Sequence, residues 1–459
     1  MAERSARIEA LKAERPDLRG EYESEVAASE AMRQVLISGP FPGIGAGHID
    51  LYKAFGWRNW QLVRAEGRIG IVLPRAALTG AGTEAWRRDV LRSGTFSDVC
   101  IVTNTGQWVF GGVDGRYTIA FGVIARASDA DTLALCGPFH SRAEFDRGRD
   151  ALAVVPLSEF LSWTSTAMFP LIPDPISATV FRRMRQQPEF RTSGFRPVIE
   201  LRPVEDRSRI DTNLERPAGP IPVLTGVSFN LWNPDHGEPY GYASESIIDH
   251  LLAKTIRTTS MAKSPFSGMS IHVAADLPVG KPRVAVRDVA RATDSRTVIA
   301  ALLPPRVAVM HAAPYLLRNG TDESDEAFVL GVLSSIPFDW YARRIVELHL
   351  TFELLGSMPV PAPDRSDPRR LRVIEIAGRL AAVDGRYFEW ASAVGVPVGS
   401  VDDAEKPELI AELDALVSHL YGLKRDHVAH VFETFHRGWN YAPRLKKVLG
   451  YFDTIEATA

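Results

Sequence analysis

The spacing of apolar residues divides the first 125 residues into alternating helices and strands. Residues 1–36 are rich in Glu, Ala and Arg and predict a helix, and a second helix with a wide apolar face is predicted over 48–64. The continuous apolar run at 69–73 is typical of a strand buried on both faces, as in a parallel sheet. Further elements are predicted at 83–92 (helix), 98–103 (strand) and 118–124 (strand). This order predicts an α/β unit.

The pattern changes again further along the chain. Periodicity fades from about 195 to 305, while Pro, Gly and Asn become frequent, which predicts an irregular, β-rich domain. Residues 326–346 and 409–421 have helical spacing, and the Pro-rich segment 358–363 is interpreted as a stiff linker. We therefore expect an α/β domain (1–130), a connecting segment (131–195), an irregular α+β domain (196–360) and a helical C-terminal domain (361–459).

Composition narrows the class of protein. Of 459 residues, 45% are hydrophobic and 24% charged, which excludes a disordered, collagen-like or coiled-coil chain. The net charge of −3 means that any nucleic-acid surface must be a local patch. Two cysteines, Cys100 and Cys136, suit a reducing cytosol, and neither a targeting segment nor a membrane-spanning run is visible. We expect a cytoplasmic protein that does not contact a membrane.

Several short motifs occur in a fixed order along nearly the whole chain. A helix carrying Asp50-Leu51-Tyr52-Lys53-Ala54-Phe55 precedes a Gly67-Arg68 strand ending at Pro74, and Val109-Phe110 precedes the last strand of the predicted unit. Further motifs lie at 227–232, 283–288, 293–297, 333–337 and 358–361. The order resembles the C-terminal portion of adenine-specific DNA methyltransferases, especially the large fused (type IIG-like) restriction–modification enzymes.

The resemblance implies a fold and a set of roles. It implies part of a Rossmann-like methyltransferase sheet, a DNA target-recognition domain, and S-adenosyl-L-methionine as the cofactor of the complete enzyme. Phe110 would stack on the adenine flipped from the duplex; the alternative is a core phenylalanine at a strand end. Asp50, Tyr52 and Phe55 would edge the cofactor's adenine pocket, whereas core packing is the alternative for Tyr52 and Phe55.

The sequence departs from that family at the catalytic motifs. It contains neither a Gly-rich turn after a first strand nor an Asn/Asp-Pro-Pro-aromatic loop, because its one Pro-Pro, Pro304-Pro305, is followed by Arg306. The loop Gly43–Gly47 follows no predicted strand and is poor support for a nucleotide site. We therefore expect that S-adenosylmethionine does not bind this chain alone. Either the chain is truncated or a separate polypeptide supplies the N-terminal methyltransferase half.

A local basic block supports the expectation of a DNA partner. Residues 251–310 contain nine basic and three acidic side chains, and such patches neutralise phosphates. We expect double-stranded DNA to contact this block; the alternative is a solvated surface with internal ion pairs. The DNA-contacting candidates are Arg283, Arg287, Arg291, Arg296 and Trp232. Trp232 could be a groove wedge or an ordinary loop anchor.

The sequence gives no support for a metal site. His427, His430 and His436 have a metal-like spacing, but no cysteine or carboxylate cluster accompanies them. The function that we expect is site-specific adenine methylation in restriction–modification or phage defence, with this chain supplying the target-base contact and DNA recognition. The alternatives are a non-catalytic recognition subunit that acts with a separate methyltransferase chain, and a decayed gene product.

Overall fold

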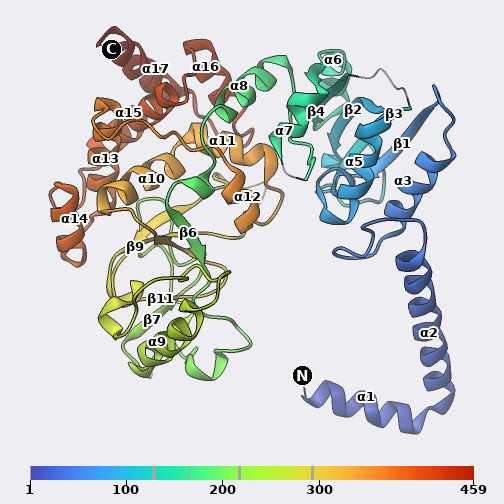
Figure 1. Cartoon of the computed structure of the whole chain (residues 1–459), viewed down its shortest axis with the longest axis horizontal. Coiled ribbons are helices and arrows are strands. Elements are labelled where there is room, and N and C mark those ends of the chain that lie inside the picture. The colour runs from blue at the N-terminus through green and yellow to red at the C-terminus, as the bar shows by residue number, and fades with distance from the viewer. Residues whose placement is uncertain (1, 127–130, 165, 216–218, 291–293, 459) are drawn as a thin grey trace. The chain divides into compact units, whose positions relative to one another are not determined.

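The chain folds into two compact units, Met1–Pro175 (unit 1) and Ile176–Ala459 (unit 2). Figure 1 shows them in a computed structural model that describes residues 2–126, 131–164, 166–215, 219–290 and 294–458. Both units combine helices with small sheets, and the C-terminal region is helical, so the expected mixed α/β class is confirmed. The one division lies after Pro175, whereas the sequence suggests boundaries after residues 130, 195 and 360.

Unit 1 contains a five-stranded sheet and seven α-helices among its described residues. The helices are α1 (Ala2–Glu14), α2 (Pro16–Ser38), α3 (Leu51–Leu62), α4 (Ala76–Thr79), α5 (Glu84–Ser93), α6 (Arg142–Gly148) and α7 (Leu157–Trp163). The strands are β1 (Arg68–Pro74), β2 (Thr95–Thr103), β3 (Thr118–Ala125), β4 (Thr132–Phe139) and β5 (Ala153–Pro156). The predicted helices and strands are confirmed here. Pro16 divides the predicted N-terminal helix in two, because proline fits the first turn of a helix but not its interior.

The sheet has the strand order β1-β3-β2-β4-β5. Strand β3 is antiparallel to both β1 and β2, and β2 is parallel to β4. Among the described residues β1 pairs with β3 alone, and its residues Arg68, Gly70 and Val72 are exposed. The prediction that this strand is buried on both faces is therefore wrong. An apolar run shows that a strand can be covered, but it does not show that the same chain covers it.

Two groups of apolar side chains fix strand β2, one near each of its ends. Near its start, Phe96 makes edge-on ring contacts with Trp86 of α5 and with Phe169, at centroid distances of 5.5 and 4.8 Å. Near its end, Cys100 and Val102 belong to a buried cluster. That cluster also contains Ile119, Cys136 and Phe139, with Trp108, Val109, Phe121, Phe145 and Leu152 packed against it. Strand β2 is thus anchored at both ends, and the loop after it starts from a rigid base.

The first part of unit 2 is β-rich and irregular, as predicted. Its strands are β6 (Phe195–Val198), β7 (Ile221–Leu224), β8 (Gly241–Ala243), β9 (Arg283–Val286), β10 (Ala300–Leu303), β11 (Ala308–Val309) and β12 (Tyr315–Arg318), and its helices are α8 (Pro175–Arg185) and α9 (Ser246–Thr259). The strands form sheets of order β10-β9-β12-β6 and β11-β7-β8. One apolar cluster joins the two sheets to α9.

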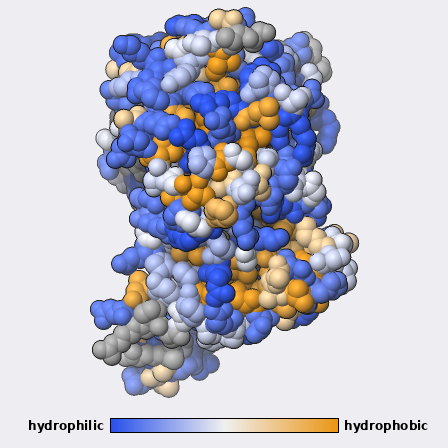
Figure 2. Space-filling model, turned by 90° about the vertical axis from the view of Figure 1, so that its left-hand side faces the viewer, coloured by the Kyte–Doolittle hydropathy of each residue, from blue (hydrophilic) through white to orange (hydrophobic). Residues whose placement is uncertain are grey.

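The second part of unit 2 is helical. Its helices are α10 (Glu323–Ser334), α11 (Ile336–Ile345), α12 (Phe352–Ser357), α13 (Pro368–Ala381), α14 (Phe388–Val394), α15 (Glu405–Leu420), α16 (Arg425–Glu433) and α17 (Ala442–Thr458). The predicted helix over 326–346 is two helices, because the Ser335 hydroxyl accepts from the Phe338 amide and begins α11. The face of this unit in Figure 2 is largely hydrophilic with apolar patches between, as expected when amphipathic helices turn apolar residues inward.

The Pro-rich segment after α12 is not a linker. Met358 and Val360 are buried. The Phe190 amide donates to the Met358 carbonyl, and the Tyr421 hydroxyl donates to the Pro359 carbonyl, at 2.8 Å each. The segment is therefore an integral part of unit 2, because its backbone oxygens bind elements from both ends of the unit.

Candidate functional site

The loop after β2 is held by one buried amide, that of Asn104. Its Oδ1 accepts from the backbone amides of Val109 and Phe110, at 3.1 and 3.0 Å. Its Nδ2 donates to the carbonyls of Phe110 and Val113, at 3.0 and 2.9 Å. The amide has two donor hydrogens and two acceptor lone pairs, so all four are used. Asn104 is fully buried, and it fixes both the backbone amide and the backbone carbonyl of Phe110.

Further contacts keep the same loop in shape. Gly106 and Gly112 have positive φ angles, +66° and +77°, which glycine adopts without steric cost. The Gln107 side-chain oxygen accepts from the Gly112 amide at 3.0 Å, and the Trp108 indole donates to the Thr103 carbonyl at 2.8 Å. The loop is therefore a fixed platform.

Two adjacent side chains of the loop point to different environments. Val109 packs against the buried cluster of β2, β3 and β4, whereas the Phe110 ring is 40% exposed. The alternative that Phe110 is a core residue is wrong. A rigid, exposed ring can stack on a planar ligand without first being ordered, which favours binding. Sequence reasoning found Phe110 but missed Asn104, whose only signal is an asparagine between a strand and a Gly-containing turn.

Helix α3 carries the three residues expected at the edge of a cofactor pocket. Asp50 caps the helix, its Oδ1 accepting from the Tyr52 amide at 3.5 Å, and the Tyr52 side chain is half-buried. Phe55 is 61% exposed, so core packing is wrong for this residue. An enclosed cofactor site needs walls from several elements, and these residues supply one helix whose Phe55 side is open. Asp50, Tyr52 and Phe55 alone therefore do not enclose a cofactor, and the expectation that S-adenosylmethionine does not bind this chain stays a prediction.

The Gly43–Gly47 loop is closed by a lysine and not built around an anion. The Lys53 ammonium of α3 donates to the carbonyls of Ala46 and His48, at 3.1 and 2.5 Å. A phosphate cradle points backbone N–H groups at its ligand, whereas this loop points carbonyls at a cation. The poor match of its glycine pattern to a nucleotide site thus has a structural reason.

The expected DNA contact is wrong for Arg283. This side chain is 3% exposed and lies on β9, where it donates to both carboxylate oxygens of Glu200, at 3.2 and 3.0 Å, and to the Val307 carbonyl at 2.8 Å. A guanidinium that is buried and already paired has no face left for a phosphate. Arg283 instead neutralises a buried carboxylate.

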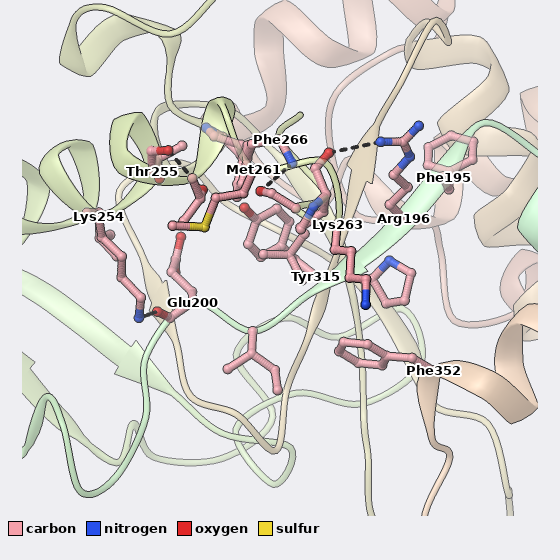
Figure 3. A pocket seen from close by; sticks show the side chains of 18 of the residues that line it. Phe195, Arg196, Glu200, Lys254, Thr255, Met261, Lys263, Phe266, Tyr315 and Phe352 are labelled. Atoms are coloured by element: carbon pink, nitrogen blue, oxygen red, sulfur yellow. Dashed lines mark hydrogen bonds between the residues drawn. The ribbon is translucent and has the colours of Figure 1, made fainter. Parts of the chain in front are cut away.

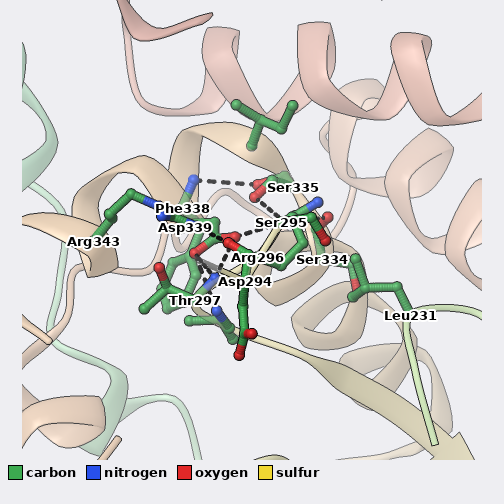
Figure 4. Close-up of polar contacts among 12 residues, drawn as sticks. Leu231, Asp294, Ser295, Arg296, Thr297, Ser334, Ser335, Phe338, Asp339 and Arg343 are labelled. Atoms are coloured by element: carbon green, nitrogen blue, oxygen red, sulfur yellow. Dashed lines mark hydrogen bonds and ion pairs between the residues drawn. The ribbon is translucent and has the colours of Figure 1, made fainter. Parts of the chain in front are cut away.

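The same correction applies to Arg296, shown in Figure 4. Its side chain is buried and paired with the fully buried Asp339 of α11, and it donates to the carbonyls of Ser334 and Ser335 at 2.8 and 2.9 Å. The Asp339 carboxylate also accepts from the amides of Thr297 and Val298, both at 3.0 Å. Arg296 thus ties the segment before β10 to the junction of α10 and α11.

Of the three remaining candidates for DNA contact, the structure describes Arg287 and Trp232 but not Arg291. Arg287 is half-buried and donates to the carbonyls of Gly226 and Phe229, at 2.6 and 3.1 Å, so it also serves the fold. Trp232 is 6% exposed in a loop closed by paired backbone hydrogen bonds, which makes it the loop anchor and not a groove wedge. Arg291 lies outside the described residues. Counting charges cannot separate paired from free arginines, so the expected DNA contact is wrong for the buried Arg283 and Arg296 and stays a prediction for the exposed residues of the block.

Within the described ranges, no group of three or more His, Cys, Asp or Glu side chains could hold a metal ion. His430 shares a 2.8 Å hydrogen bond with the Ser177 hydroxyl, which connects α16 to α8. No described helix is long and apolar enough to cross a membrane.

Comparison with known proteins adds structural likeness alone. The sequence matches no protein-family model and no curated protein. Among solved structures, the chain is similar to the type IIL restriction-modification enzyme MmeI in complex with DNA, with a TM-score of 0.42 and 13% identity over 84% of this chain and 51% of that one. It is similar to the type IIG restriction endonuclease BpuSI, with a TM-score of 0.30 and 14% identity over 87% and 52%.

A third similar structure is a DrdV–DNA complex, with a TM-score of 0.34 and 10% identity over 77% of this chain and 41% of that one. The chain thus spans about half the length of the first two structures and less of the third.

Proposed function

We propose that this chain supplies the target-base contact and DNA recognition for adenine-specific DNA methylation in a restriction–modification or phage-defence system. The observation that carries the proposal is Phe110, an exposed ring on a loop that Asn104 holds rigid. Flipping a base from a duplex costs a few kcal/mol. Stacking on an aromatic ring contributes about 1–3 kcal/mol and offsets much of that cost.

The proposal includes a second polypeptide. S-adenosyl-L-methionine would donate the methyl group in the complete enzyme, and Asp50, Tyr52 and Phe55 of α3 would supply only one edge of its site. We therefore propose that a separate chain carrying the N-terminal methyltransferase half completes the enzyme, and that the two act on double-stranded DNA. Calorimetric titration of S-adenosylmethionine into this chain alone should show no saturable binding at sub-millimolar concentration.

The open side of unit 1 supports such a partner. Leu51, Phe55 and Leu62 of α3 are 54%, 61% and 66% exposed, and on the edge strand β1 Val72 is 54% exposed. Apolar side chains on a helix next to an unpaired strand edge favour association with another polypeptide. This surface, defined by these four residues, is called the α3–β1 surface below.

The test of the function is a Phe110→Ala variant in the enzyme reconstituted with the N-terminal half. Methyl transfer should slow by about tenfold to a hundredfold, the equivalent of about 1–3 kcal/mol of stacking. Overall DNA affinity should change little, because phosphate contacts dominate it. A fluorescent adenine analogue at the target position should report less flipping.

Two further variants make the result specific. Phe110→Trp keeps an aromatic face and should retain most of the activity. Phe388→Ala removes an exposed phenylalanine of unit 2, 69% exposed on α14, and should leave methyl transfer unchanged. Parent-like flipping and methylation by Phe110→Ala would contradict the role of Phe110. In a non-catalytic recognition subunit, Phe110→Ala would also leave methylation by the partner unchanged.

A further inference from the structure

A cleft of about 890 Å³ lies in unit 2, between β6, α9 and the loop that follows α9. Figure 3 shows that its labelled side chains come from these elements, from the segment that follows β6, and from β12 and α12. Its walls include the buried rings of Phe195, Phe266 and Tyr315 and the partly exposed ring of Phe352. The size is in the range of small-molecule sites, and the walls are largely aromatic and aliphatic.

The rim of the cleft is basic. Its lining contains five basic residues and one acidic residue, Glu200. The basic residues are Arg191, Arg196, Arg202, Lys254 and Lys263. Because Glu200 is paired with the buried Arg283, its charge does not offset the rim. The cleft as a whole therefore favours an anion.

Two of these cations are free of acidic partners. Arg191 is paired with Glu189 and Glu353, and Lys254 lies 3.6 Å from Asp206. By contrast, Arg196 and Lys263 have no ion pair within the described part of the chain, and both are exposed. The Arg196 guanidinium donates once, to the Pro265 carbonyl at 3.2 Å, which orients it and leaves other N–H groups available.

A buried polar group faces the same space. Tyr315 is 2% exposed and lines the cleft, and Arg283 lies 4.9 Å from the centre of its ring. Its hydroxyl has no hydrogen-bond partner among the residues that the structure describes. In Figure 3 the tyrosine lies in the middle of the cleft, between Met261 and Phe352. Because Tyr315 lines the cleft, its hydroxyl is available to a polar group of a ligand there.

We propose that this cleft binds a nucleotide, with the base between the apolar walls, the Tyr315 hydroxyl on a polar group of the base, and the phosphate on Arg196 and Lys263. An anion alone needs no aromatic walls, and an apolar ligand needs no basic rim. A nucleotide has both parts joined in one molecule. The site takes either a free nucleotide or one nucleotide unit of a nucleic-acid strand, and the proposal does not rest on Phe110.

The direct test is calorimetric titration of the whole chain with deoxynucleoside 5′-monophosphates, single-stranded oligonucleotides and inorganic phosphate. We expect saturable nucleotide binding at sub-millimolar concentration and binding of inorganic phosphate at least tenfold weaker. Saturation by a monophosphate identifies a free nucleotide as a sufficient ligand, whereas saturation by oligonucleotides alone identifies a nucleic-acid strand. No saturation by either class, or equal binding of inorganic phosphate, would overturn the proposal.

Variants connect the binding to the cleft. Arg196→Ala with Lys263→Ala should weaken nucleotide binding by at least tenfold. Arg209→Ala with Lys281→Ala removes the same charge from exposed positions outside the lining and should change binding less than twofold. Equal losses in the two double variants would show a general charge effect and contradict the site.

Tyr315→Phe tests the hydroxyl separately. It keeps the ring and removes a group without a protein partner, so folding should be unaffected and nucleotide binding should weaken by about three- to tenfold. Tyr242→Phe, at a half-buried tyrosine outside the lining, should bind like the parent protein. Parent-like binding by Tyr315→Phe would remove the hydroxyl from the site and contradict the proposed recognition of the base.

Discussion

The Asn104 side chain binds both the amide and the carbonyl of Phe110, at 3.0 Å each. Asn104 thus holds Phe110, the residue that would stack on a base, through its backbone and leaves the ring outside the core. A loop fixed in this way loses little conformational freedom when it binds, because the cost of ordering it has already been met during folding.

The first prediction concerns Asn104. Asn104→Ala removes four hydrogen bonds and should lower the free energy of unfolding of unit 1 by about 2–6 kcal/mol, since each such bond contributes about 0.5–1.5 kcal/mol. Hydrogen exchange should show faster exchange of the Val109 and Phe110 amides. Asn104→Asp keeps the acceptor for these amides and should protect them better than the alanine variant. Unchanged protection in Asn104→Ala would show that the loop is held by other contacts.

The second prediction separates stability from DNA binding at Arg296. Arg296→Met leaves the Asp339 charge buried without its partner and should destabilise unit 2 by about 3–5 kcal/mol, measured by hydrogen exchange of α10 and α11. The salt dependence of duplex binding should keep its slope, because no phosphate contact is lost.

Arg257 is the matched control for that experiment, as an exposed arginine of the same basic block. Arg257→Met should change stability by no more than about 0.5 kcal/mol. If Arg257 contacts a phosphate, its loss should reduce the salt slope by about 0.9. A reduced slope with unchanged stability in Arg296→Met would restore the original expectation of a DNA contact.

The sequence predicts the secondary structure of this chain better than the environment of its side chains. The predicted helices and strands of the first 125 residues follow from local periodicity, which is a property of neighbouring residues. The pairing of Arg283 with Glu200 joins residues 83 positions apart, and no local pattern contains that contact. For the same reason the basic block looked like a surface, although two of its arginines are buried.

The position of a strand in its sheet and the contacts within a loop also could not be predicted from the sequence. The apolar run at 69–73 predicts a strand with neighbours on both faces, yet β1 lies at the edge of the sheet. Phe110 was found through a two-residue motif, whereas the role of Asn104 depends on a loop that returns to it five to nine residues later. Periodicity does not describe such a return, since it depends on turn geometry.

The third prediction concerns the α3–β1 surface. Phe55→Glu with Leu62→Glu should weaken association with a polypeptide carrying the N-terminal half by about a hundredfold or more, because burying each apolar side chain contributes about 1.5–3 kcal/mol. The stability of this chain should change little, since both side chains are exposed. Leu371→Glu, at a residue 52% exposed on α13 of unit 2, should associate like the parent. Equal affinity of all three proteins would show that the partner binds elsewhere.

The last prediction concerns Glu326 in α10, whose pKa is raised to about 7. Burial is the main cause of the raised pKa, and the charge of Arg318 and a hydrogen bond from Trp390 oppose it. The Trp390 indole donates to one carboxylate oxygen at 3.0 Å, and the Val284 amide donates to the other at 3.2 Å. In the unfolded chain the same carboxyl ionises near its usual pKa of 4.5.

Between pH 4.5 and about 7 the folded state therefore binds more protons at Glu326 than the unfolded state does. The contribution of this residue to stability is full below pH 4.5 and is lost as the pH rises towards 7, by about 3 kcal/mol in all. Glu326→Gln cannot ionise, so its stability relative to the parent should increase across this window. Denaturant unfolding, followed by tryptophan fluorescence at several pH values, measures the difference in the free energy of unfolding between the two proteins. The contribution of histidine titration cancels in this difference, because both proteins contain the same histidines.

Glu323 provides a control of opposite sign on the same helix. Its pKa is lowered by its hydrogen bond to Arg318 despite partial burial, so Glu323→Gln should lose stability relative to the parent as the pH rises through the acid range. The two variants should thus diverge, Glu326→Gln gaining and Glu323→Gln losing with rising pH. A flat difference for Glu326→Gln would mean that Glu326 ionises as readily in the folded protein as in the unfolded chain. Its carboxylate would then be stabilised by Trp390, Val284 and Arg318 strongly enough to overcome burial.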